Sequence, residues 1–221
     1  MARCVSFLLV GDAPWAKHMV ESANRVLGLP IIQMSDEHTP KVEGVTHVVR
    51  IKKEIPLMPY RLMHLASFGH EEMLILDCDC IVKKPVDDVW ERKFDIALCR
   101  RNEQFCFDES TGRNVASLMP VNTGVMFSRN NAFWAEAAIW LCEQTDYQKW
   151  WGDQMAVAEV CKREKYHVLL LPANKFNWTP LDEEDSSEAR IWHYKGVKRK
   201  AWIENSANVV IRPSSLFQLS P

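Results

Sequence analysis

The feature that most constrains the fold is a series of short apolar runs, several of them separated by segments with helical spacing. Val5–Val10, Glu72–Leu76 and Val168–Leu171 are such runs, and runs that lack a polar face are typical of strands covered on both sides. Apolar residues recur at helical spacing over Trp15–Leu27 and Leu57–Phe68. Strands that alternate with helices predict an α/β domain with a mostly parallel, mixed central sheet covered by helices.

Turn residues and further apolar runs place the remaining elements. Gly28 and Pro30 end the first helix, and Asp153 is suited to cap a helix over Asp153–Arg163. Further strands are expected at Pro30–Met34, Val45–Ile51, Phe94–Cys99, Val125–Phe127 and Ile191–Tyr194, and a further helix at Asn131–Gln144.

Length and composition narrow the function classes. With 221 residues, the chain has room for one α/β domain. Its 27 Lys and Arg residues nearly balance 29 Asp and Glu residues, for a net charge of −2. This balance argues against a uniformly basic surface that would bind nucleic acid or lipid by charge alone. Hydrophobic residues make up 47%, so the chain can bury a core and is not a disordered protein.

Seven cysteines and the N-terminal segment bear on the compartment. No CxxC pair occurs, so the usual zinc-ribbon spacing is missing, and several cysteines lie in apolar runs, where a thiol acts as a small hydrophobe. No secretory signal follows Met1, and no apolar run reaches the roughly 20 residues of a membrane-spanning helix. We therefore expect a cytoplasmic protein with reduced cysteines and no integral membrane segment.

A pair of aspartates follows the clearest strand. Asp77 and Asp79 come directly after Glu72–Leu76, and the side-chain period of two places both carboxylates on one face. Two carboxylates so close repel each other unless a cation neutralises them, and hard oxygen ligands suit Mg²⁺ or Mn²⁺. The alternative is a solvated pair that opens a turn. Cys78 and Cys80 alternate with the aspartates and are expected to face the core.

Four other segments carry polar side chains with a chemical use, although each also has an ordinary structural reading. His193 begins a segment that ends in Lys198-Arg199-Lys200, where the imidazole suits a metal, Gly196 allows close backbone approach, and the cations suit phosphates; the alternative is a basic surface turn. Asn122-Thr123-Gly124 suits a sugar hydroxyl or is a plain turn. Asp153-Gln154 opens a helix, and the alternative is that it is an ordinary N-cap. Arg61 suits contact with a ligand, and the alternative is a solvated charge.

Taken together and in this order, these segments resemble the family-8 retaining glycosyltransferases, to which glycogenin and bacterial galactosyltransferases are related. Leu74–Val82 resembles the family's apolar strand that ends in Asp-x-Asp, and Asn122–Phe127 resembles its Asn-x-Gly segment. Gly152–Gln154 resembles its Asp-Gln helix start, and Leu171-Pro172 with Phe176-Asn177 resembles a further stretch. The resemblance runs from about residue 5 to about residue 202. It implies a single Rossmann-like domain of the GT-A fold in the nucleotide-diphospho-sugar transferase superfamily.

The resemblance implies where a nucleotide sugar and a metal would bind. Asp77, Asp79 and His193 would hold Mn²⁺, or Mg²⁺, on the diphosphate of a UDP-sugar. Asp12 would bind the uracil edge and Trp15 would stack on the uracil ring. The other residues that it assigns to the nucleotide and diphosphate are Val10, Cys78, Gly196, Arg199 and Lys200.

The resemblance also implies a donor-sugar site and a mechanism. Asn122 and Asp153 would bind the donor sugar, with Thr123 and Gly124 beside them, and Arg61 would contact the donor. Gln154 would lie beside the anomeric carbon, and Asp153 and Gln154 are the expected catalytic residues. Since Gln154 is a neutral amide and a poor nucleophile, we expect same-face attack by the acceptor hydroxyl, with retention of configuration.

The chain divides by this resemblance into a nucleotide-binding half at 1–82, a donor-sugar and acceptor half at 83–202, and a C-terminal tail at 203–221. One departure concerns Cys99-Arg100-Arg101, which stands where the family usually carries an acidic residue near the donor sugar. This leaves the donor sugar open. Arg199-Lys200-Ala201-Trp202 replaces the family's final Lys-Pro-Trp, so Lys198, Arg199 and Lys200 all remain candidates for the diphosphate.

The acceptor and two rival functions remain open at this stage. The acceptor is a glycan, a small molecule, a protein hydroxyl or a modified nucleic-acid base, since Arg100-Arg101 and Lys195–Lys200 form a local basic strip. Candidates for an acceptor platform are Trp150, Trp151, Trp178 and Trp192. A nucleotidyltransferase of related fold is one rival, although Val10–Trp15 lacks its Gly-rich basic loop. The other is a non-catalytic sugar-nucleotide binding protein.

Overall fold

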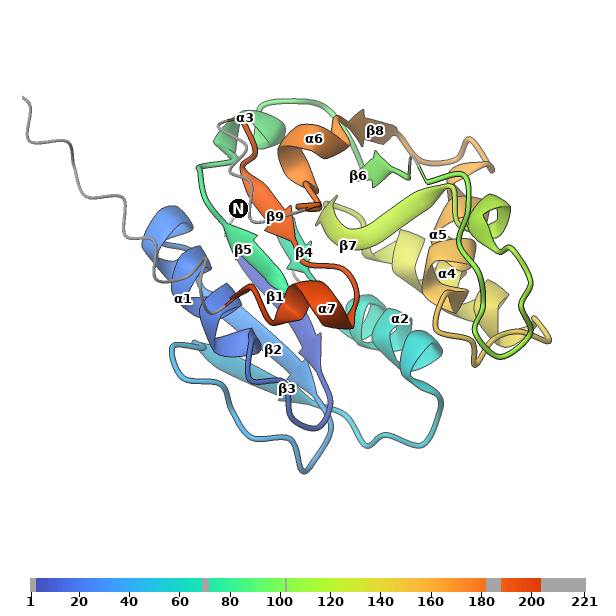
Figure 1. Cartoon of the computed structure of the whole chain (residues 1–221), viewed down its shortest axis with the longest axis horizontal. Coiled ribbons are helices and arrows are strands. Elements are labelled where there is room, and N and C mark those ends of the chain that lie inside the picture. The colour runs from blue at the N-terminus through green and yellow to red at the C-terminus, as the bar shows by residue number, and fades with distance from the viewer. Residues whose placement is uncertain (1–2, 69–71, 102, 182–187, 204–221) are drawn as a thin grey trace, which may run out of the picture.

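The computed structural model describes residues 3–68, 72–101, 103–181 and 188–203. Residues 204–221 of the expected tail lie outside this part. The strands are β1 (Arg3–Leu9), β2 (Ile31–Ser35), β3 (His47–Arg50), β4 (Glu72–Leu76), β5 (Cys80–Val82), β6 (Ile96–Arg100), β7 (Val121–Ser128), β8 (Val168–Leu171) and β9 (Ile191–His193). The helices are α1 (Ala16–Leu27), α2 (Leu57–Ser67), α3 (Asp87–Trp90), α4 (Asn131–Cys142), α5 (Gly152–Cys161), α6 (Ala173–Phe176) and α7 (Val197–Lys200), with a 3₁₀ turn at Ala116–Leu118 (Figure 1).

The central sheet has seven strands in the order β3-β2-β1-β4-β7-β6-β8. β1 pairs in parallel with β2 and β4, β2 with β3, and β6 with β8, whereas β7 runs antiparallel to both of its neighbours. This confirms the expected α/β class with a mostly parallel, mixed sheet. β7 is longer than the predicted Val125–Phe127, because its first residues pair with β6 beyond an irregularity between Leu98 and Cys99.

A second, two-stranded sheet joins β5 to β9, with Cys80 opposite His193. β5 has three residues, too few to show a periodic pattern, and the sequence did not predict it. The main-chain N–H of Tyr194 donates to the Asp79 carbonyl, 3.0 Å away. Pairing two strands that lie more than a hundred residues apart therefore brings the turn after β4 beside the end of β9.

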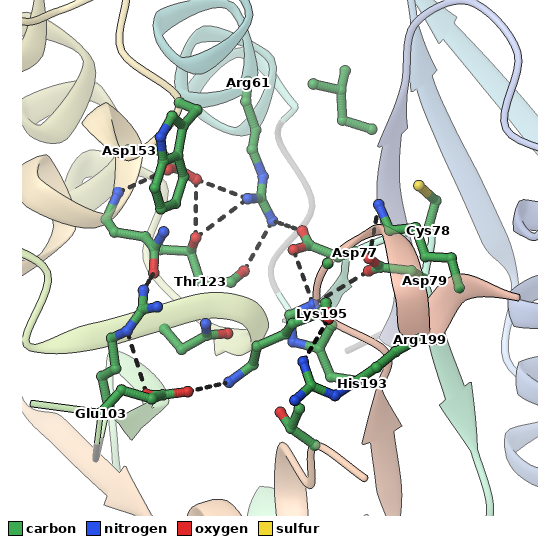
Figure 2. Close-up of a pocket in the computed structure, with 18 of the residues that line it drawn as sticks. Arg61, Asp77, Cys78, Asp79, Glu103, Thr123, Asp153, His193, Lys195 and Arg199 are labelled. Carbon is green, nitrogen blue, oxygen red and sulfur yellow. Dashed lines mark hydrogen bonds and ion pairs between the residues drawn. The ribbon is translucent and has the colours of Figure 1, made fainter. Parts of the chain in front are cut away.

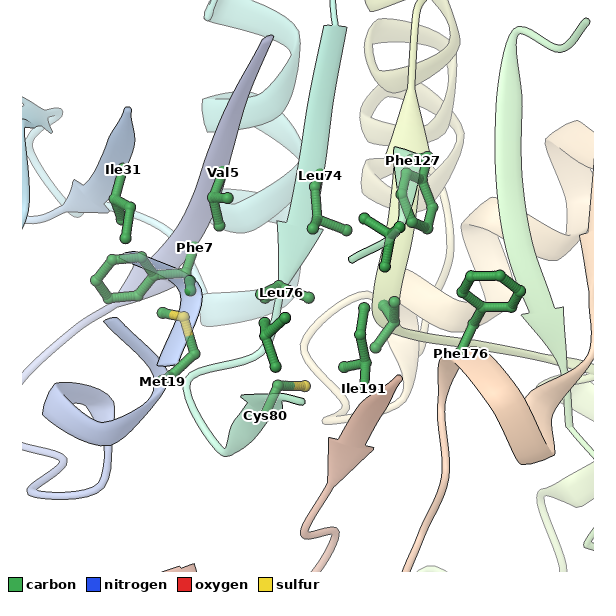
Figure 3. Packing of buried hydrophobic residues seen from close by; sticks show 14 of the residues in the cluster. Val5, Phe7, Met19, Ile31, Leu74, Leu76, Cys80, Phe127, Phe176 and Ile191 are labelled. Atoms are coloured by element: carbon green, nitrogen blue, oxygen red, sulfur yellow. The ribbon is translucent and has the colours of Figure 1, made fainter. Parts of the chain in front are cut away.

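Side chains on the two faces of the sheet bury two apolar clusters. Val5, Phe7 and Leu74 pack with α1 on one face (Figure 3). Ile75 and Leu98 belong to the cluster on the other face, where α2, α4 and α5 contribute their apolar sides. All residues of β4 are buried, as its unbroken apolar run predicts.

Helix boundaries follow local chemistry at some places and tertiary contacts at others. α1 stops at Gly28, whose φ of 63° is left-handed, and Asn130 accepts a hydrogen bond from the Ala132 N–H at the start of α4. The expectation that Asp153 caps its helix is wrong. Trp151 is the N-cap of α5, and the Asp153 side chain turns to other partners. In the described part of the chain, no helix has the length and apolarity needed to cross a membrane.

Candidate active site

A cavity of about 980 Å³ opens where the turn after β4 faces β7, α2, α5 and the segment from β9 to α7. Ligand sites of open α/β sheets lie at such strand ends. Figure 2 shows side chains from all of these segments around one space. The cavity brings together most of the predicted site residues, namely Arg61, Asp77, Cys78, Asp79, Asn122, Thr123, Asp153, Gln154, His193, Gly196, Arg199 and Lys200.

Arg61 forms the centre of a buried ionic network. Its Nη2 lies 2.8 Å from Asp77 Oδ1, and its Nη1 lies 2.8 Å from Asp153 Oδ2. Nη2 also donates to the Thr123 carbonyl at 2.9 Å. Burial opposes the charge of the guanidinium, but Asp77 and Asp153 outweigh this effect and raise the pKa of Arg61. Arg61 is therefore a fixed cation that orients Asp77 rather than a solvated charge.

The Asp153 carboxylate is fully occupied by donors. It accepts hydrogen bonds from Arg61 Nη1, from Thr123 Oγ1 at 2.9 Å and from the Gln154 N–H at 2.8 Å. These three donors favour the ionised form, but burial outweighs them and raises the pKa of Asp153. Because these donors lie on α2, β7 and α5, Asp153 links the three elements. The residue is only 2% exposed.

Asp77 and Asp79 both approach the imidazole of His193, and Asp79 and His193 belong to a buried group whose ligand atoms lie within 4.8 Å of one another. His193 Nε2 lies 3.5 Å from Asp77 Oδ2 and 3.2 Å from Asp79 Oδ1. Asp79 Oδ1 is buried and has no hydrogen-bond partner in the part of the chain that the structure describes. Three groups that can each offer an electron pair thus face one another in a buried place.

A chain of amides fixes which nitrogen of His193 faces the aspartates. The backbone N–H of Gly124 donates to Asn122 Oδ1, and Asn177 Nδ2 donates to the same oxygen. Asn177 therefore turns its Oδ1 toward His193 Nδ1, 2.9 Å away, and accepts a hydrogen bond from the Nδ1–H group. The Nε2 lone pair then faces the two carboxylates, as in metal sites whose second shell sets the imidazole tautomer.

Gly124 makes room for the imidazole. A Cβ at this position would lie 2.0 Å from His193 Cε1. The sequence placed Gly124 against the nucleotide sugar, whereas in the structure it lies under the His193 ring and is not among the residues that line the cavity. Only a glycine allows the ring to pack against β7 in this way.

These residues fit a divalent cation. The carboxylates and a neutral imidazole are ligands suited to Mn²⁺ or Mg²⁺. Cys80 Sγ also lies near Asp79 and His193, but it contacts the Gly124 carbonyl at 3.4 Å, and burial raises its pKa well above the usual range. In the metal-free site the thiol donates to this carbonyl, and as a soft ligand it suits Mn²⁺ or Mg²⁺ less well than the carboxylates do.

Lys200 and Arg199 add positive charge at the same end of the cavity. Lys200 Nζ lies 3.2 Å from Asp79 Oδ2. Burial alone would raise the pKa of Asp79, but in the metal-free site the His193 imidazole, when it carries a proton on Nε2, and Lys200 outweigh burial and lower the pKa to about 2. Arg199 donates to the carbonyls of Pro180 and Lys195 at 2.8 and 3.0 Å, which anchors the loop between β9 and α7. Lys198 does not line the cavity.

Three other predicted residues also lie outside this group. Val10, Asp12 and Trp15 are not among the described residues that line the cavity. Trp15 packs against the small cluster around Ile81 and Trp192, and Lys200 Nζ lies 4.9 Å from the centre of its ring. Its assignment to uracil stacking stays a prediction, as do those of Val10 and Asp12.

The cavity also contains three charged residues outside the predicted site list, of which Arg101 and Lys195 were expected only in a basic strip and Glu103 was not singled out. Arg101, Glu103 and Lys195 line it opposite the aspartates. Arg101 Nη1 lies 3.3 Å from Gln154 Oε1, and Glu103 contacts both Arg101 and Lys195. An acidic residue does therefore follow β6 in the cavity, three residues beyond the strand. The Arg-x-Glu spacing was the available signal, but it does not show which way the loop folds.

The arrangement can hold an anionic ligand together with a divalent cation. No family model matches the sequence, and no curated protein matches it. Solved structures do match. One is the glycosyltransferase GlyE of Streptococcus pneumoniae TIGR4, with a TM-score of 0.64 and 16% identity over 95% of this chain. The match covers 61% of that chain, so the present chain spans about three fifths of its length.

Two further structures match over nearly their whole length. A glycosyltransferase involved in the glycosylation of the major capsid of PBCV-1 has a TM-score of 0.62 and 16% identity, over 91% of this chain and 99% of that one. The galactosyltransferase LgtC, solved with donor and acceptor sugar analogues, has a TM-score of 0.56 and 11% identity, over 95% and 98%. At such identities the likeness concerns the fold, and it confirms the expected glycosyltransferase fold, GT-A.

Proposed function

We propose that this chain is a metal-dependent glycosyltransferase that moves a sugar from a nucleotide-diphosphate sugar, a UDP-sugar, to an acceptor hydroxyl with retention of configuration. The observation that carries the proposal is the approach of two carboxylates to His193 Nε2, with Asp77 Oδ2 at 3.5 Å and Asp79 Oδ1 at 3.2 Å. Such a group of acceptors repels itself unless a proton or a metal cation lies among them. It stands beside Arg199 and Lys200, in a cavity large enough for a nucleotide sugar.

The difficulty of the reaction lies in the departure of the nucleoside diphosphate. When bound, a divalent metal held by Asp77, Asp79 and His193 would neutralise charge on that leaving group. Lys200 and Arg199 add fixed positive charge on the same side, where negative charge develops. Arg61 holds Asp77 in place through its 2.8 Å contact, so that the carboxylate needs no reorientation.

The residues near the expected anomeric carbon favour same-face attack. Asp153 is buried and bound by three donors, which makes it a poor nucleophile. Gln154 is a neutral amide and accepts from Arg101. In this proposal the acceptor hydroxyl attacks from the face that the diphosphate leaves, and the departing phosphate oxygen takes its proton. An inverted linkage in the product, read by NMR, would overturn this part.

The two rival functions predict different chemistry. A nucleotidyltransferase needs a basic, glycine-rich loop after its first strand; here the loop after β1 has one glycine, and its N–H donates to Thr39 Oγ1 at 2.7 Å. A pure binding protein would take up the nucleotide sugar without releasing UDP. The acceptor would enter from the open side near Trp150, which is 46% exposed. It is a glycan, a small molecule, a protein or a modified nucleic-acid base.

The test is a panel of nucleotide sugars with Mn²⁺, read by release of the nucleoside diphosphate. We expect release from at least one UDP-sugar, loss of release with EDTA, and loss in Asp79→Asn. Asp87→Asn, an exposed aspartate on α3, serves as the matched control and keeps full activity. Full activity of Asp79→Asn would refute the metal role, and binding without release would favour the non-catalytic alternative.

A further inference from the structure

Arg101 is a buried cation with poor partners. Its side chain is 10% exposed. Two of its contacts are to sulfur, Met119 Sδ at 3.6 Å and Cys106 Sγ at 3.4 Å, and sulfur is a weak acceptor. The third is the neutral Gln154 Oε1, at 3.3 Å. Its Nε is buried and makes no hydrogen bond in the described part of the chain, although Glu103 Oε2 lies 3.3 Å away.

A second cation faces the same place. Lys195 Nζ has a single carboxylate nearby, Glu103 Oε1 at 3.4 Å, and its side chain is 21% exposed. Glu103 is itself 42% exposed and is shared between Arg101 and Lys195. Figure 2 shows Glu103 and Lys195 on the side of the cavity that faces away from Asp79. One half-exposed carboxylate thus serves two cations, one of which is nine-tenths buried.

These residues also line a smaller adjoining cavity of about 170 Å³. A water in bulk takes about 30 Å³, so the space admits a carboxylate or phosphate group with some of its hydration. Asn122 and Trp178 belong to both cavities. Arg101 lies next to Gln154, the residue expected beside the anomeric carbon, and the smaller cavity that Arg101 shares with Lys195 does not include the aspartates that would hold the diphosphate end.

A buried guanidinium is stabilised by charge-assisted hydrogen bonds to an anion; sulfur and amide acceptors supply none, and the half-exposed Glu103 is shared with Lys195. Resting on the proposed glycosyltransferase function, we propose that Arg101 and Lys195 bind an anionic group, a carboxylate or phosphate, on a substrate part other than the nucleotide diphosphate. This group belongs either to the transferred sugar, as in a hexuronate, or to the acceptor. Glu103 holds the two cations in position and limits their combined charge.

The experiment measures binding to the full chain with Mn²⁺ by calorimetry, in two arms. The donor arm compares UDP, UDP-glucose and UDP-glucuronate. The acceptor arm compares glucose with glucuronate and glucose 6-phosphate on protein saturated with UDP. In one arm we expect the ligand with the charged sugar to bind about 10- to 100-fold more tightly than the ligand with the uncharged sugar, which is the range of one or two charge-assisted hydrogen bonds. The arm that shows the preference identifies the source of the anion.

Three variants separate this role from a structural one. Arg101→Gln and Lys195→Gln should each abolish the preference for the charged member while UDP binds as before. Glu103→Gln should strengthen it, since the two cations lose their counter-charge. Arg113→Gln, an exposed arginine of the same loop, is the matched control and should change nothing.

Two results would overturn the inference. One is wild-type protein that shows no charge preference in either arm. The other is Arg101→Gln protein that loses affinity for charged and neutral members equally. A different result would contradict the proposed function instead: protein that binds no UDP and releases none from any UDP-sugar. This failure can be told apart from failure of the inference because UDP serves as the reference in both arms.

Discussion

Replacing Gly124 by alanine tests the central geometry of the site. The added Cβ would lie 2.0 Å from Cε1, 2.5 Å from Nδ1 and 2.9 Å from Nε2 of His193. Carbon atoms in contact lie about 3.5–4.0 Å apart, so the ring must retreat by about 1.5 Å. The ring is 4% exposed and held by Asn177 at 2.9 Å, so a movement of this size breaks that bond.

The expected cost follows from these two effects. Overpacking a buried place costs about 1–3 kcal/mol, and a lost hydrogen bond costs about 0.5–1.5 kcal/mol. The free energy of unfolding should fall by about 2–4 kcal/mol, which for a domain of this size lowers Tm by roughly 4–16 °C. Because His193 Nε2 leaves its place opposite Asp77 and Asp79, Mn²⁺ should also no longer raise Tm.

A double-mutant cycle supplies the control. A His193→Ala background removes the three atoms nearest to the added methyl group, so Gly124→Ala should cost less than about 1 kcal/mol there, read by urea unfolding. An equal cost in both backgrounds would refute the reasoning, because the penalty would then come from the backbone of β7 and not from the imidazole.

Three further predictions concern other residues. His64 on α2 is fully buried, and burial lowers its pKa to about 4. Below pH 6.5 the unfolded chain therefore binds more protons than the folded one, and the free energy of unfolding should fall by about 3 kcal/mol between pH 6.5 and pH 4. His64→Phe should flatten this fall in unfolding curves measured across that pH range. Asp153→Asn leaves the buried Arg61 undercompensated and should cost about 3 kcal/mol in urea unfolding; an unchanged midpoint would contradict the network. Trp15→Ala should raise the KM for the donor far more than Trp140→Ala does, and equal effects would exclude uracil stacking.

The buried strands could be predicted because their sequences leave no polar face. β4 was predicted with its observed bounds, Glu72–Leu76. β7 was predicted short, because Asn122 and Thr123 have the polarity of a loop although both are buried. Their polar atoms are satisfied by Asn177, Asp153 and the Gly124 N–H, contacts that no local pattern reveals.

The acidic end of the site could be predicted because it lies in short motifs. Asp77 and Asp79 share one turn, and β9 delivers His193 to them. The Arg101–Glu103–Lys195 group depends instead on how the loop after β6 packs, with Lys195 coming from a segment far along the chain. The sequence placed Arg101 and Lys195 in a basic strip and did not single out Glu103, and only the contacts in the structure show that the three form one group.

Asp153 shows how the structure changes the chemistry expected from a motif. From the sequence it was a helix cap, a sugar ligand and a catalytic candidate. In the structure its carboxylate neutralises Arg61 and binds Thr123, so neither member of this pair offers a free charge to a ligand. The charges left to face a substrate then separate, with Asp77, Asp79, Arg199 and Lys200 at one end and the cationic pair at the other. Of the neutral residues that line the cavity, Gln154 contacts Arg101, and Asn122 is linked to His193 through Asn177. A substrate that fits this order carries a diphosphate at one end, hydroxyls in the middle and a second anion beyond them.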